Sequence, residues 1–258
     1  MLVDATVFVT GASSGIGQAC ARAFAAAGAR LLLCARRDDR LARLAGDLDA
    51  EVHHFPLDVR DREAVDAAVG GLPAEWRDVD VLVNNAGLAV GLAPLQEGDP
   101  DDWDRMIDTN VRGLLNVTRA VVPAMVARGT GHLITIGSVA GRETYPSGAV
   151  YCASKAAADR ITAGLRMDVL GSGLRVSTVD PGLVDTEFSV VRFQGDRDRA
   201  EGVYAGMTPL SADDVADAVV WVADRPAHVQ VTDLVILPTA QASATRVARA
   251  GMPDRPGP

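Results

Sequence analysis

Tyr151 and Lys155 stand four residues apart, a spacing that places both side chains on one face of a helix. A phenol with its ordinary pKa of about 10 is a poor base at neutral pH, and a neighbouring ammonium lowers that pKa. Lys155 is the only lysine among the 25 basic residues, which indicates a position that needs a compact ammonium rather than a guanidinium. The pair predicts a phenol that exchanges protons at neutral pH. A surface lysine beside a helix-starting tyrosine is the alternative.

Ser138 adds a hydroxyl to this pair. It follows the apolar run His132–Ile136, which predicts a strand. In a parallel sheet a residue just after a strand lies at the carboxyl edge, where ligands bind. Ser138 would there hold a substrate oxygen against Tyr151, although a serine in this setting is also common as a turn residue.

The segment Thr10–Gly17 (TGASSGIG) carries three glycines between an expected strand and an expected helix. Glycines there let the backbone approach a pyrophosphate closely, and the start of the helix offers free N–H groups and a positive dipole end. A tight turn without a ligand is the alternative. Because the segment follows a strand and opens a helix, the pattern favours a dinucleotide site.

The residues after the second expected strand indicate which dinucleotide binds. A site for NAD usually places a carboxylate there, about 20 residues after the glycines. Here Arg36 and Arg37 stand at that point, and the first acid is Asp38. Guanidinium groups suit a 2′-phosphate, so NADP is expected. The alternative is a pair of solvated arginines at a helix start.

Two further polar residues end expected strands. Asp58 would accept a hydrogen bond from an adenine amino group, or act as a helix cap or turn residue. Asn85, in the run Asn84–Gly87, would line the adenosine or hold the loop. The spacing leaves both alternatives open at each position.

Strands and helices alternate from the first residues to about residue 238. This order is typical of a parallel sheet covered on both faces, so we expect one Rossmann-type, doubly wound α/β domain of seven mostly parallel strands over residues 1–238. The expected strands are Thr6–Thr10, Arg30–Ala35, Glu51–Leu57, Val79–Val83, His132–Ile136, Leu174–Val179 and Leu234–Leu237. The expected helices are Gly15–Gly28, Asp38–Leu48, Glu63–Val69, Pro100–Ile107, Val111–Ala127, Tyr151–Leu170 and Ala212–Ala223. The run 187–207 is expected to be loop-like, and 239–258 to be a tail that is loosely ordered or packed at a subunit interface.

The composition argues against several classes of binding partner. With 34 acidic and 25 basic residues the net charge is −9, and the absence of a basic stripe argues against nucleic acids and anionic membranes. A hydrophobic fraction of 48% excludes a disordered chain, and no apolar run approaches the roughly 18 residues of a membrane span. The N-terminus does not resemble a signal peptide. Cys20, Cys34 and Cys152 suggest neither a disulfide framework nor a metal site, so a reducing cytoplasm and no metal are expected.

The motifs together resemble the signature of the short-chain dehydrogenase/reductase family, in order and over essentially the whole chain. They are Thr10–Gly17, Asn84–Gly87, Asn110, Ser138, Tyr151 and Lys155. The second half is more similar still to the NADP-dependent 3-hydroxy acid dehydrogenases of that family, which act on serine or L-allo-threonine. The stretches that carry this similarity are Gly87–Gly91, Trp103–Gly113, Pro181–Phe193, Ser211–Ala223 and Ile236–Ala242.

The resemblance implies a role for each of these residues. Tyr151 would be the general acid/base, and Lys155 would lower its pKa and bond the nicotinamide ribose. Ser138 would orient the substrate oxygen, and Asn110 would hold a water in a proton relay to Lys155. The implied cofactor contacts are Gly11, Ser13, Ser14, Gly15, Ile16 and Gly17 at the pyrophosphate, Arg36 and Arg37 at the 2′-phosphate, Asp58 at adenine, Asn85 at the adenosine, Pro181, Gly182, Val184 and Thr186 at the nicotinamide, and Val59, Ala86 and Gly87 along the cofactor. Members of the family are usually tetramers, which implies a homotetramer built through the helices near 111–127 and 151–170.

A 3-hydroxy acid needs a cation for its carboxylate. Arg142 and Arg192 are the candidates near segments expected to cover the substrate, although either would also suit a solvated surface. The loop-like run 187–207 would close as a lid after substrate binds, or serve as an ordinary connector.

We therefore expect reversible hydride transfer between NADP and a 3-hydroxy acid such as serine, allo-threonine or a 3-hydroxyisobutyrate-like acid. A broad or secondary-metabolite ketone or aldehyde reductase would share every residue above except the carboxylate-binding arginine. An NADP-binding sensor without turnover is a third possibility, against which the complete set of Asn110, Ser138, Tyr151 and Lys155 argues.

Overall fold

Apolar runs form the seven strands of one parallel sheet in the computed structural model, which describes residues 2–250. The strand order is β3-β2-β1-β4-β5-β6-β9. The strands are β1 (Thr6–Thr10), β2 (Arg30–Ala35), β3 (Val52–Pro56), β4 (Val81–Asn84), β5 (Gly131–Ile136), β6 (Leu174–Pro181) and β9 (Asp233–Ile236). β1 and β4 are buried along their whole length, as parallel strands covered on both faces are. The expected doubly wound architecture is confirmed.

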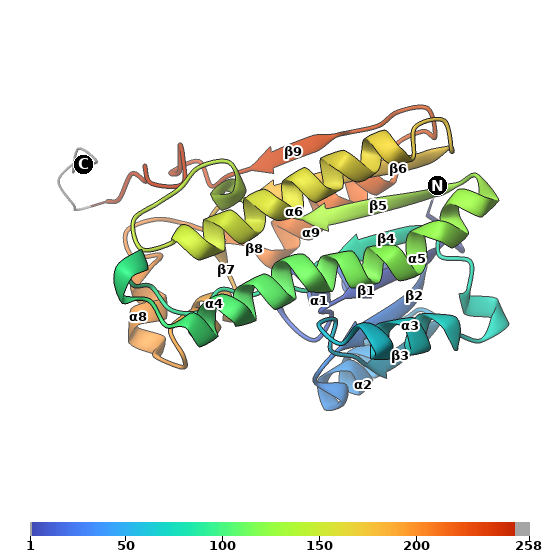
Figure 1. Ribbon diagram of the computed structural model, residues 1–258, viewed down its shortest axis with the longest axis horizontal. Helices are drawn as coiled ribbons and strands as arrows, with labels where there is room; N and C mark the ends of the chain where they lie inside the picture. Colours follow the sequence, from blue (N-terminus) through green and yellow to red (C-terminus); the bar gives the residue numbers. More distant parts are fainter. Residues whose placement is uncertain (1, 251–258) are drawn as a thin grey trace.

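Helices cover the sheet in two layers (Figure 1). α1, α2 and α9 pack on one face, and α3, α5 and α6 pack on the other. The helices are α1 (Gly15–Ala26), α2 (Asp38–Asp47), α3 (Arg62–Gly70), α4 (Pro100–Ile107), α5 (Leu114–Arg128), α6 (Ala149–Asp168), α7 (Glu187–Arg192), α8 (Arg197–Gly202) and α9 (Ala212–Ala223). Within residues 2–250, none of them has the length and apolar character needed to cross a membrane.

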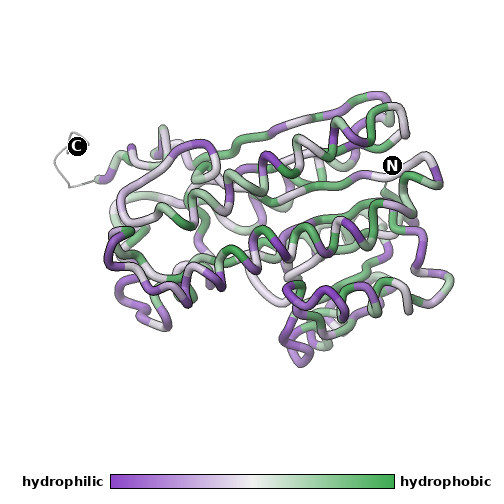
Figure 2. Tube along the Cα trace, viewed as in Figure 1, coloured by the Kyte–Doolittle hydropathy of each residue, from purple (hydrophilic) through white to green (hydrophobic). Residues whose placement is uncertain are grey.

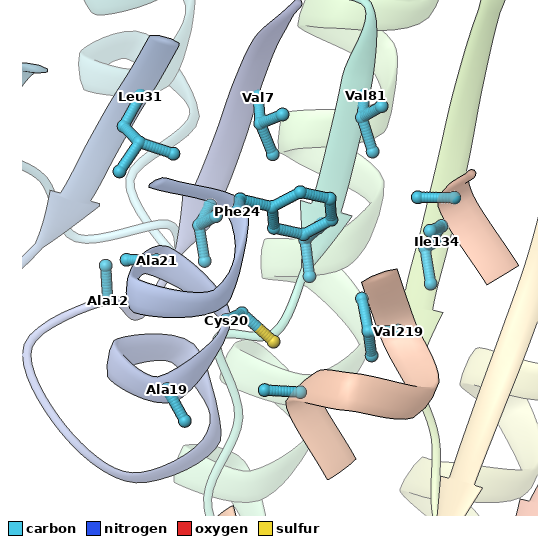
Figure 3. Packing of buried hydrophobic residues seen from close by; sticks show 14 of the residues in the cluster. Val7, Ala12, Ala19, Cys20, Ala21, Phe24, Leu31, Val81, Ile134 and Val219 are labelled. Carbon is cyan, nitrogen blue, oxygen red and sulfur yellow. The ribbon is translucent and has the colours of Figure 1, made fainter. Parts of the chain in front are cut away.

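The middle and the end of α1 pack against the sheet and against α9. Phe24 and Cys20 of α1 lie against Val7 and Val81 of the sheet and Val219 of α9 (Figure 3), and all five side chains are buried. Burial of such side chains is worth roughly 1.5–3 kcal/mol each for the larger apolar residues. α1 is therefore held rigidly, and its N-terminus with it.

The chain passes from α4 to α5 through a π-helical segment, Asp108–Gly113, where the sequence led us to expect a break between two helices. π-helical turns are rare and are often found at functional sites. Close packing fixes the end of this segment, because a Cβ on Gly113 would lie 2.6 Å from Cγ2 of Val59. The segment carries Asn110 in a buried position.

The run 187–207 was expected to be loop-like, and that expectation was wrong. It contains α7 and α8, which begin at the capping residues Thr186 and Asp196. A small parallel pair of strands, β7 (Val184–Asp185) and β8 (Leu210–Ser211), joins the two ends of this region. We call residues 184–207 the covering segment. In Figure 2 the part of it around α8 is mostly hydrophilic, in contrast to the largely hydrophobic central strands.

Residues 239–250 of the C-terminal tail make contacts within the chain, and their predicted place at a subunit interface stays a prediction. Gln241 is buried, and its Oε1 accepts a hydrogen bond from Leu183 N at 2.8 Å. Ala250 N donates to Gly206 O at 2.8 Å. These bonds attach the segment to its own chain beside the covering segment. The rest of the predicted tail, 251–258, lies outside the described residues.

Candidate active site

One large cavity, with a volume of about 1830 Å³, follows the carboxyl edge of the sheet. Single small-molecule pockets usually occupy roughly 300–1,000 Å³, so this one has room for a dinucleotide and a substrate together. It reaches from Arg36 at one end to Tyr151 and Arg192. The other predicted site residues line it too, except Gly17, Asn110 and Arg142.

The glycine-rich turn has the shape that a pyrophosphate needs. Gly11 and Gly15 adopt positive φ angles of 67° and 53°, which favour glycine. A Cβ on Gly11 would lie 2.9 Å from Cα of Ala86, and a Cβ on Gly17 would collide with the Asn85 amide. Gly17 therefore serves close packing of α1, while Gly11 and Gly15 face the cavity. The residues present fit a dinucleotide at this point.

The two arginines after β2 differ in their partners. Arg37 donates to the hydroxyls of Ser13 (3.2 Å) and Ser14 (2.7 Å), and it pairs with Glu187 at 3.2 Å. Arg40, which the sequence analysis did not single out, pairs with Glu187 at 2.8 Å. Arg36 is exposed and lines the cavity without an ion pair in the described chain. Guanidinium charge therefore gathers where a 2′-phosphate is expected.

Asp58 and Asn85 both lie at the cavity wall, and each is also held by the protein. The Asp58 carboxylate accepts from Nη2 of Arg60 at 2.6 Å, and this contact lowers the pKa of Asp58. Nδ2 of Asn85 donates to the carbonyl oxygen of Thr10 at 2.9 Å. Holding the loop, one of the two alternatives for Asn85, is thus a role that it performs.

Ser138 and Tyr151 meet at the opposite end of the cavity. Ser138 precedes a short 3-10 helix, η4 (Val139–Gly141), and its Oγ accepts from Ala140 N at 3.1 Å. The buried ring of Tyr151 lies 5.7 Å from that of Phe188, measured between centroids. Burial raises the pKa of Tyr151, whereas the Ser138 hydroxyl and the charge of Arg192 act to lower it.

Lys155 lies one turn after Tyr151 on α6, as its spacing predicts, and is buried. Its Nζ donates to Ile136 O at 2.8 Å, at the end of β5. Burial lowers the pKa of Lys155 to about 8, and the carboxylates of Asp159 and Asp180 act in the opposite direction. The lowering of the Tyr151 pKa by Lys155 stays a prediction.

Asn110 is close to Lys155 but does not line the main cavity. Its Nδ2 donates to Leu88 O at 2.8 Å and to Ser154 Oγ at 2.9 Å, and its Oδ1 accepts from Leu88 N at 2.8 Å. A second cavity of about 10 Å³ is lined by Asn110 and Lys155. A single water needs roughly 10–15 Å³ of such space.

Two buried carboxylates, unnoticed in the sequence, lie behind Lys155. Asp159 is one turn further along α6, and Asp180 is at the end of β6. Asp159 Oδ1 is buried without a hydrogen-bond partner among the described residues. Burial raises the pKa of Asp159 to about 7, and the neighbouring charge of Asp180 raises it as well. A Cβ on Gly137 would meet both carboxylates, so this glycine makes room for them.

The two arginines proposed to hold a substrate carboxylate occupy different settings. Arg142 is paired with Asp180 at 2.7 Å and with Asp233 at 3.3 Å, and it does not line the cavity. Arg192, the last residue of α7, does line it. No carboxylate of residues 2–250 pairs with the Arg192 guanidinium, whose Cζ lies 5.8 Å from the centroid of the Tyr151 ring.

The remaining wall is built by the end of β6 and by the covering segment. Pro181, Gly182, Val184 and Thr186 line the cavity, and their contact with a nicotinamide stays a prediction. A Cβ on Gly182 would collide with the Gln241 side chain, which packs there from the C-terminal segment. The sequence analysis missed Gln241 as an anchor. Its signal was a polar residue after the apolar strand β9, within a stretch already similar to the family.

Comparison with known proteins agrees with this geometry. The family model described as short chain dehydrogenase matches residues 5–196, and the chain belongs to that family. The chain is 46% identical to the NADP-dependent 3-hydroxy acid dehydrogenase of Salmonella typhi, over 92% of this chain and 96% of the relative. It is 48% identical to sulfoacetaldehyde reductase 2 of Chromohalobacter salexigens, over 92% of this chain and 95% of the relative.

Among solved structures, the chain resembles the closed form of serine dehydrogenase complexed with NADP+. The TM-score is 0.90 at 43% sequence identity, and the match covers 98% of this chain and 100% of the other. These relatives confirm the resemblance found in the sequence. The prediction of NADP agrees with the names of the first relative and of this structure.

Proposed function

We propose that this short-chain dehydrogenase uses NADP to interconvert a small 3-hydroxy acid and its carbonyl form. Serine, allo-threonine and 3-hydroxyisobutyrate-like acids are the proposed substrates. The observation that carries the proposal is the cation of Arg192, unpaired with any carboxylate of the described chain and next to the Tyr151 ring. A buried or half-buried cation in a cavity favours an anionic ligand.

Bound NADP+ would supply the hydride acceptor, and residues of this chain would accept the proton and pass it on. Tyr151 would take the proton of the substrate hydroxyl as hydride leaves the carbon that bears this hydroxyl, with Ser138 orienting the oxygen. The raised pKa of Tyr151 requires positive charge nearby for the phenolate to form, and the ammonium of Lys155 is the group suited to provide it. Arg36 and Arg37 are proposed to hold the 2′-phosphate, and Gly11 and Gly15 the pyrophosphate.

The small cavity beside Lys155 supports a proton relay. It has the volume of about one water and is lined by Lys155 and Asn110. Both ends of the Asn110 amide are already hydrogen-bonded. The water would therefore hydrogen-bond to the Asn110 backbone or to Lys155 rather than to the Asn110 side chain. The Lys155 ammonium would give a proton to this water and take the proton of Tyr151 in its place, which would return Tyr151 to the phenolate.

A neutral ketone or aldehyde reductase is the second candidate. Apolar side chains favour it, because Phe188, Val191 and Phe193 line the cavity from the covering segment. The names of two relatives support the anionic class instead, since a 3-hydroxy acid carries a carboxylate and sulfoacetaldehyde carries a sulfonate. A cytoplasmic location and a homotetramer are part of the same proposal.

The first test is NADPH formation from L-serine and from 3-hydroxyisobutyrate, with NADP+ and NAD+ in parallel. Turnover with NADP+ is expected, and Tyr151→Phe should lose about 10²–10⁴-fold in kcat, the usual contribution of a positioned acid/base. Activity on neutral aldehydes without activity on either acid would transfer the substrate assignment to the second candidate. Tight NADPH binding without any turnover would favour the sensor.

A further inference from the structure

Tyr145 presents an unused polar atom to the substrate end of the cavity. The residue lines that cavity, and its hydroxyl is buried without a partner of good hydrogen-bond geometry in the described chain. The Arg192 guanidinium and the Cys152 thiol lie close enough to this hydroxyl to affect its pKa. Most buried hydroxyls are hydrogen-bonded, because leaving one unpaired costs about 1–3 kcal/mol. An unpaired hydroxyl in a binding cavity therefore points to a ligand that completes it.

The Tyr145 ring is held in place by its surroundings. Pro146 follows it and restricts its backbone, and Gly148 N donates to Tyr145 O at 3.1 Å to close a turn. A Cβ on Gly148 would collide with the Tyr145 ring, so the glycine leaves the space that the ring fills. The ring also packs against the apolar cluster that includes Tyr151 and Cys152. The hydroxyl position is thus fixed by packing.

Arg192 lies near the rings of both tyrosines. Its guanidinium carbon lies 5.3 Å from the Tyr145 ring centroid and 5.8 Å from the Tyr151 ring centroid. α7 is tied to the loop after β4, because Gly91 N donates to Arg192 O at 3.0 Å and Nε of Arg192 approaches Gly91 O at 3.4 Å. A donor hydroxyl and a cation without a carboxylate partner therefore face the same small region beside the reacting phenol.

We propose that Tyr145 and Arg192 form one anion subsite, in which the Tyr145 hydroxyl donates a hydrogen bond to the acid group that the Arg192 guanidinium neutralises. This inference rests on the proposed function and adds a specificity-determining residue to it. The ligand group is an oxyanion at the end of a short chain, a carboxylate or a sulfonate. Tyr151 lies close to the same guanidinium. In the substrate, the reacting hydroxyl must therefore be only a few bonds from the acid group.

The test is Tyr145→Phe, which keeps the ring and removes the unpaired hydroxyl. Substrates of matched size separate charge from shape: 3-hydroxypropanoate, its neutral amide, and 2-hydroxyethanesulfonate. A lost hydrogen bond to a charged group should lower the ratio of kcat/KM for the carboxylate to that for the amide by about 10- to 100-fold, mainly through KM. The loss of kcat/KM is then compared between 3-hydroxypropanoate and 2-hydroxyethanesulfonate. The acid with the larger loss shows whether the subsite is suited to a carboxylate or to a sulfonate.

Tyr204→Phe is the matched control, because Tyr204 also lines the cavity but its hydroxyl donates to Val184 O at 2.7 Å. In the absence of substrate, Tyr204→Phe should lower the melting temperature, whereas Tyr145→Phe should leave it unchanged or raise it. A fall in melting temperature for Tyr145→Phe equal to that of Tyr204→Phe, with equal losses on acid and amide, would overturn the inference in favour of a structural role.

The two proposals fail in different ways. If the wild-type protein oxidises no acid, the proposed function fails, and the subsite fails with it. If the wild-type protein oxidises acids and Tyr145→Phe keeps the wild-type ratio of acid to amide, only the subsite is wrong. A selective loss on acids with unchanged thermal stability supports both.

Discussion

The reacting edge of the sheet and the covering segment handle charge in opposite ways. At the reacting edge, the charges of Asp159, Asp180 and Arg142 lie near Lys155 and act on one another, and the salt bridge of Arg142 uses the fully buried Asp180. On the covering segment, Arg192 faces the cavity with no carboxylate partner in residues 2–250. The first region balances its charges internally, and the second leaves a charge for a ligand.

This difference separates chemistry from specificity. The residues proposed to handle the proton come from the end of a strand and the first turns of a twenty-residue helix, elements fixed by the core. The residues expected to choose the substrate come from a six-residue helix and from a loop, and loops vary more readily in sequence than the elements of a core. One scaffold can thus keep its reaction while the cover changes its preference.

The test with the largest expected effect replaces one arginine by alanine in each of the two regions. Arg192→Ala should lower kcat/KM for hydroxy acids by about 10- to 100-fold, because a hydrogen-bonded charge contact is worth about 1.5–3 kcal/mol. Arg142→Ala should instead destabilise the fold, by about 2–3 kcal/mol after allowance for its partial exposure, because it leaves the buried Asp180 unpaired. Steady-state kinetics on acid and amide substrates and urea unfolding measure the two effects.

Each variant serves as the control for the other. A selective loss on acids with Arg142→Ala, together with unchanged kinetics for Arg192→Ala, would reverse the comparison. It would place the anion site at the sheet edge and return Arg142 to the role considered for it from the sequence.

The second prediction concerns the buried carboxylates alone. The pKa of Asp159 is raised to about 7, mainly by burial, whereas an unfolded aspartate titrates at about 3.9. The folded state therefore holds more protons between about pH 4 and pH 7, and the free energy of unfolding falls as pH rises through that window. Asp159→Asn should flatten this fall by up to about 1.4 kcal/mol per pH unit, the value for one proton.

Urea unfolding of the wild type and of Asp159→Asn at several pH values from 5 to 8 measures this slope. Asp66→Asn, on the exposed side of α3, is the control and should keep the wild-type slope. The pKa of Asp180 is also raised, mainly by burial, and this carboxylate remains in the variant, so some slope should persist. Parallel curves for wild type and variant would mean that Asp159 is ionised throughout.

Local patterns were sufficient to predict the sheet and the elements that carry Tyr151, Lys155 and Ser138. The strand runs are short, apolar and interrupted by turn residues, and Tyr151, Lys155 and Ser138 lie at positions fixed by those elements. The short helices of the covering segment were missed because six residues carry too little periodicity. The caps Thr186 and Asp196 were the available signal.

Other features depend on contacts between residues distant in sequence. Arg142 pairs with Asp180 and Asp233, and Gln241 bonds Leu183, so neither partner set can be seen in a local stretch. The unpaired state of the Tyr145 hydroxyl is likewise a property of the whole cavity. The only hint in the sequence was that the chain has three tyrosines and that Tyr145 lies close to Tyr151.

The smallest predicted effect lies where the covering segment meets the nucleotide end. Glu187, the first residue of α7, pairs with both Arg37 and Arg40, and all three side chains are partly exposed. A carboxylate there competes with a 2′-phosphate for the same guanidinium groups. Since exposed pairs are worth about 0.2–1 kcal/mol, Glu187→Gln should tighten NADP+ binding by up to about fivefold at low salt.

Calorimetric titration with NADP+ and NAD+ at low and high salt separates the possible roles of Glu187. The gain should vanish at high salt and be absent for NAD+, which lacks the phosphate, because screening weakens exposed charge contacts. Glu63→Gln, an exposed substitution on α3, should leave both affinities unchanged. Weaker NADP+ binding by Glu187→Gln would mean that Glu187 positions the arginines for the phosphate. In that case the covering segment would help to build the nucleotide site. It would then contribute to cofactor binding as well as to the choice of substrate through Arg192.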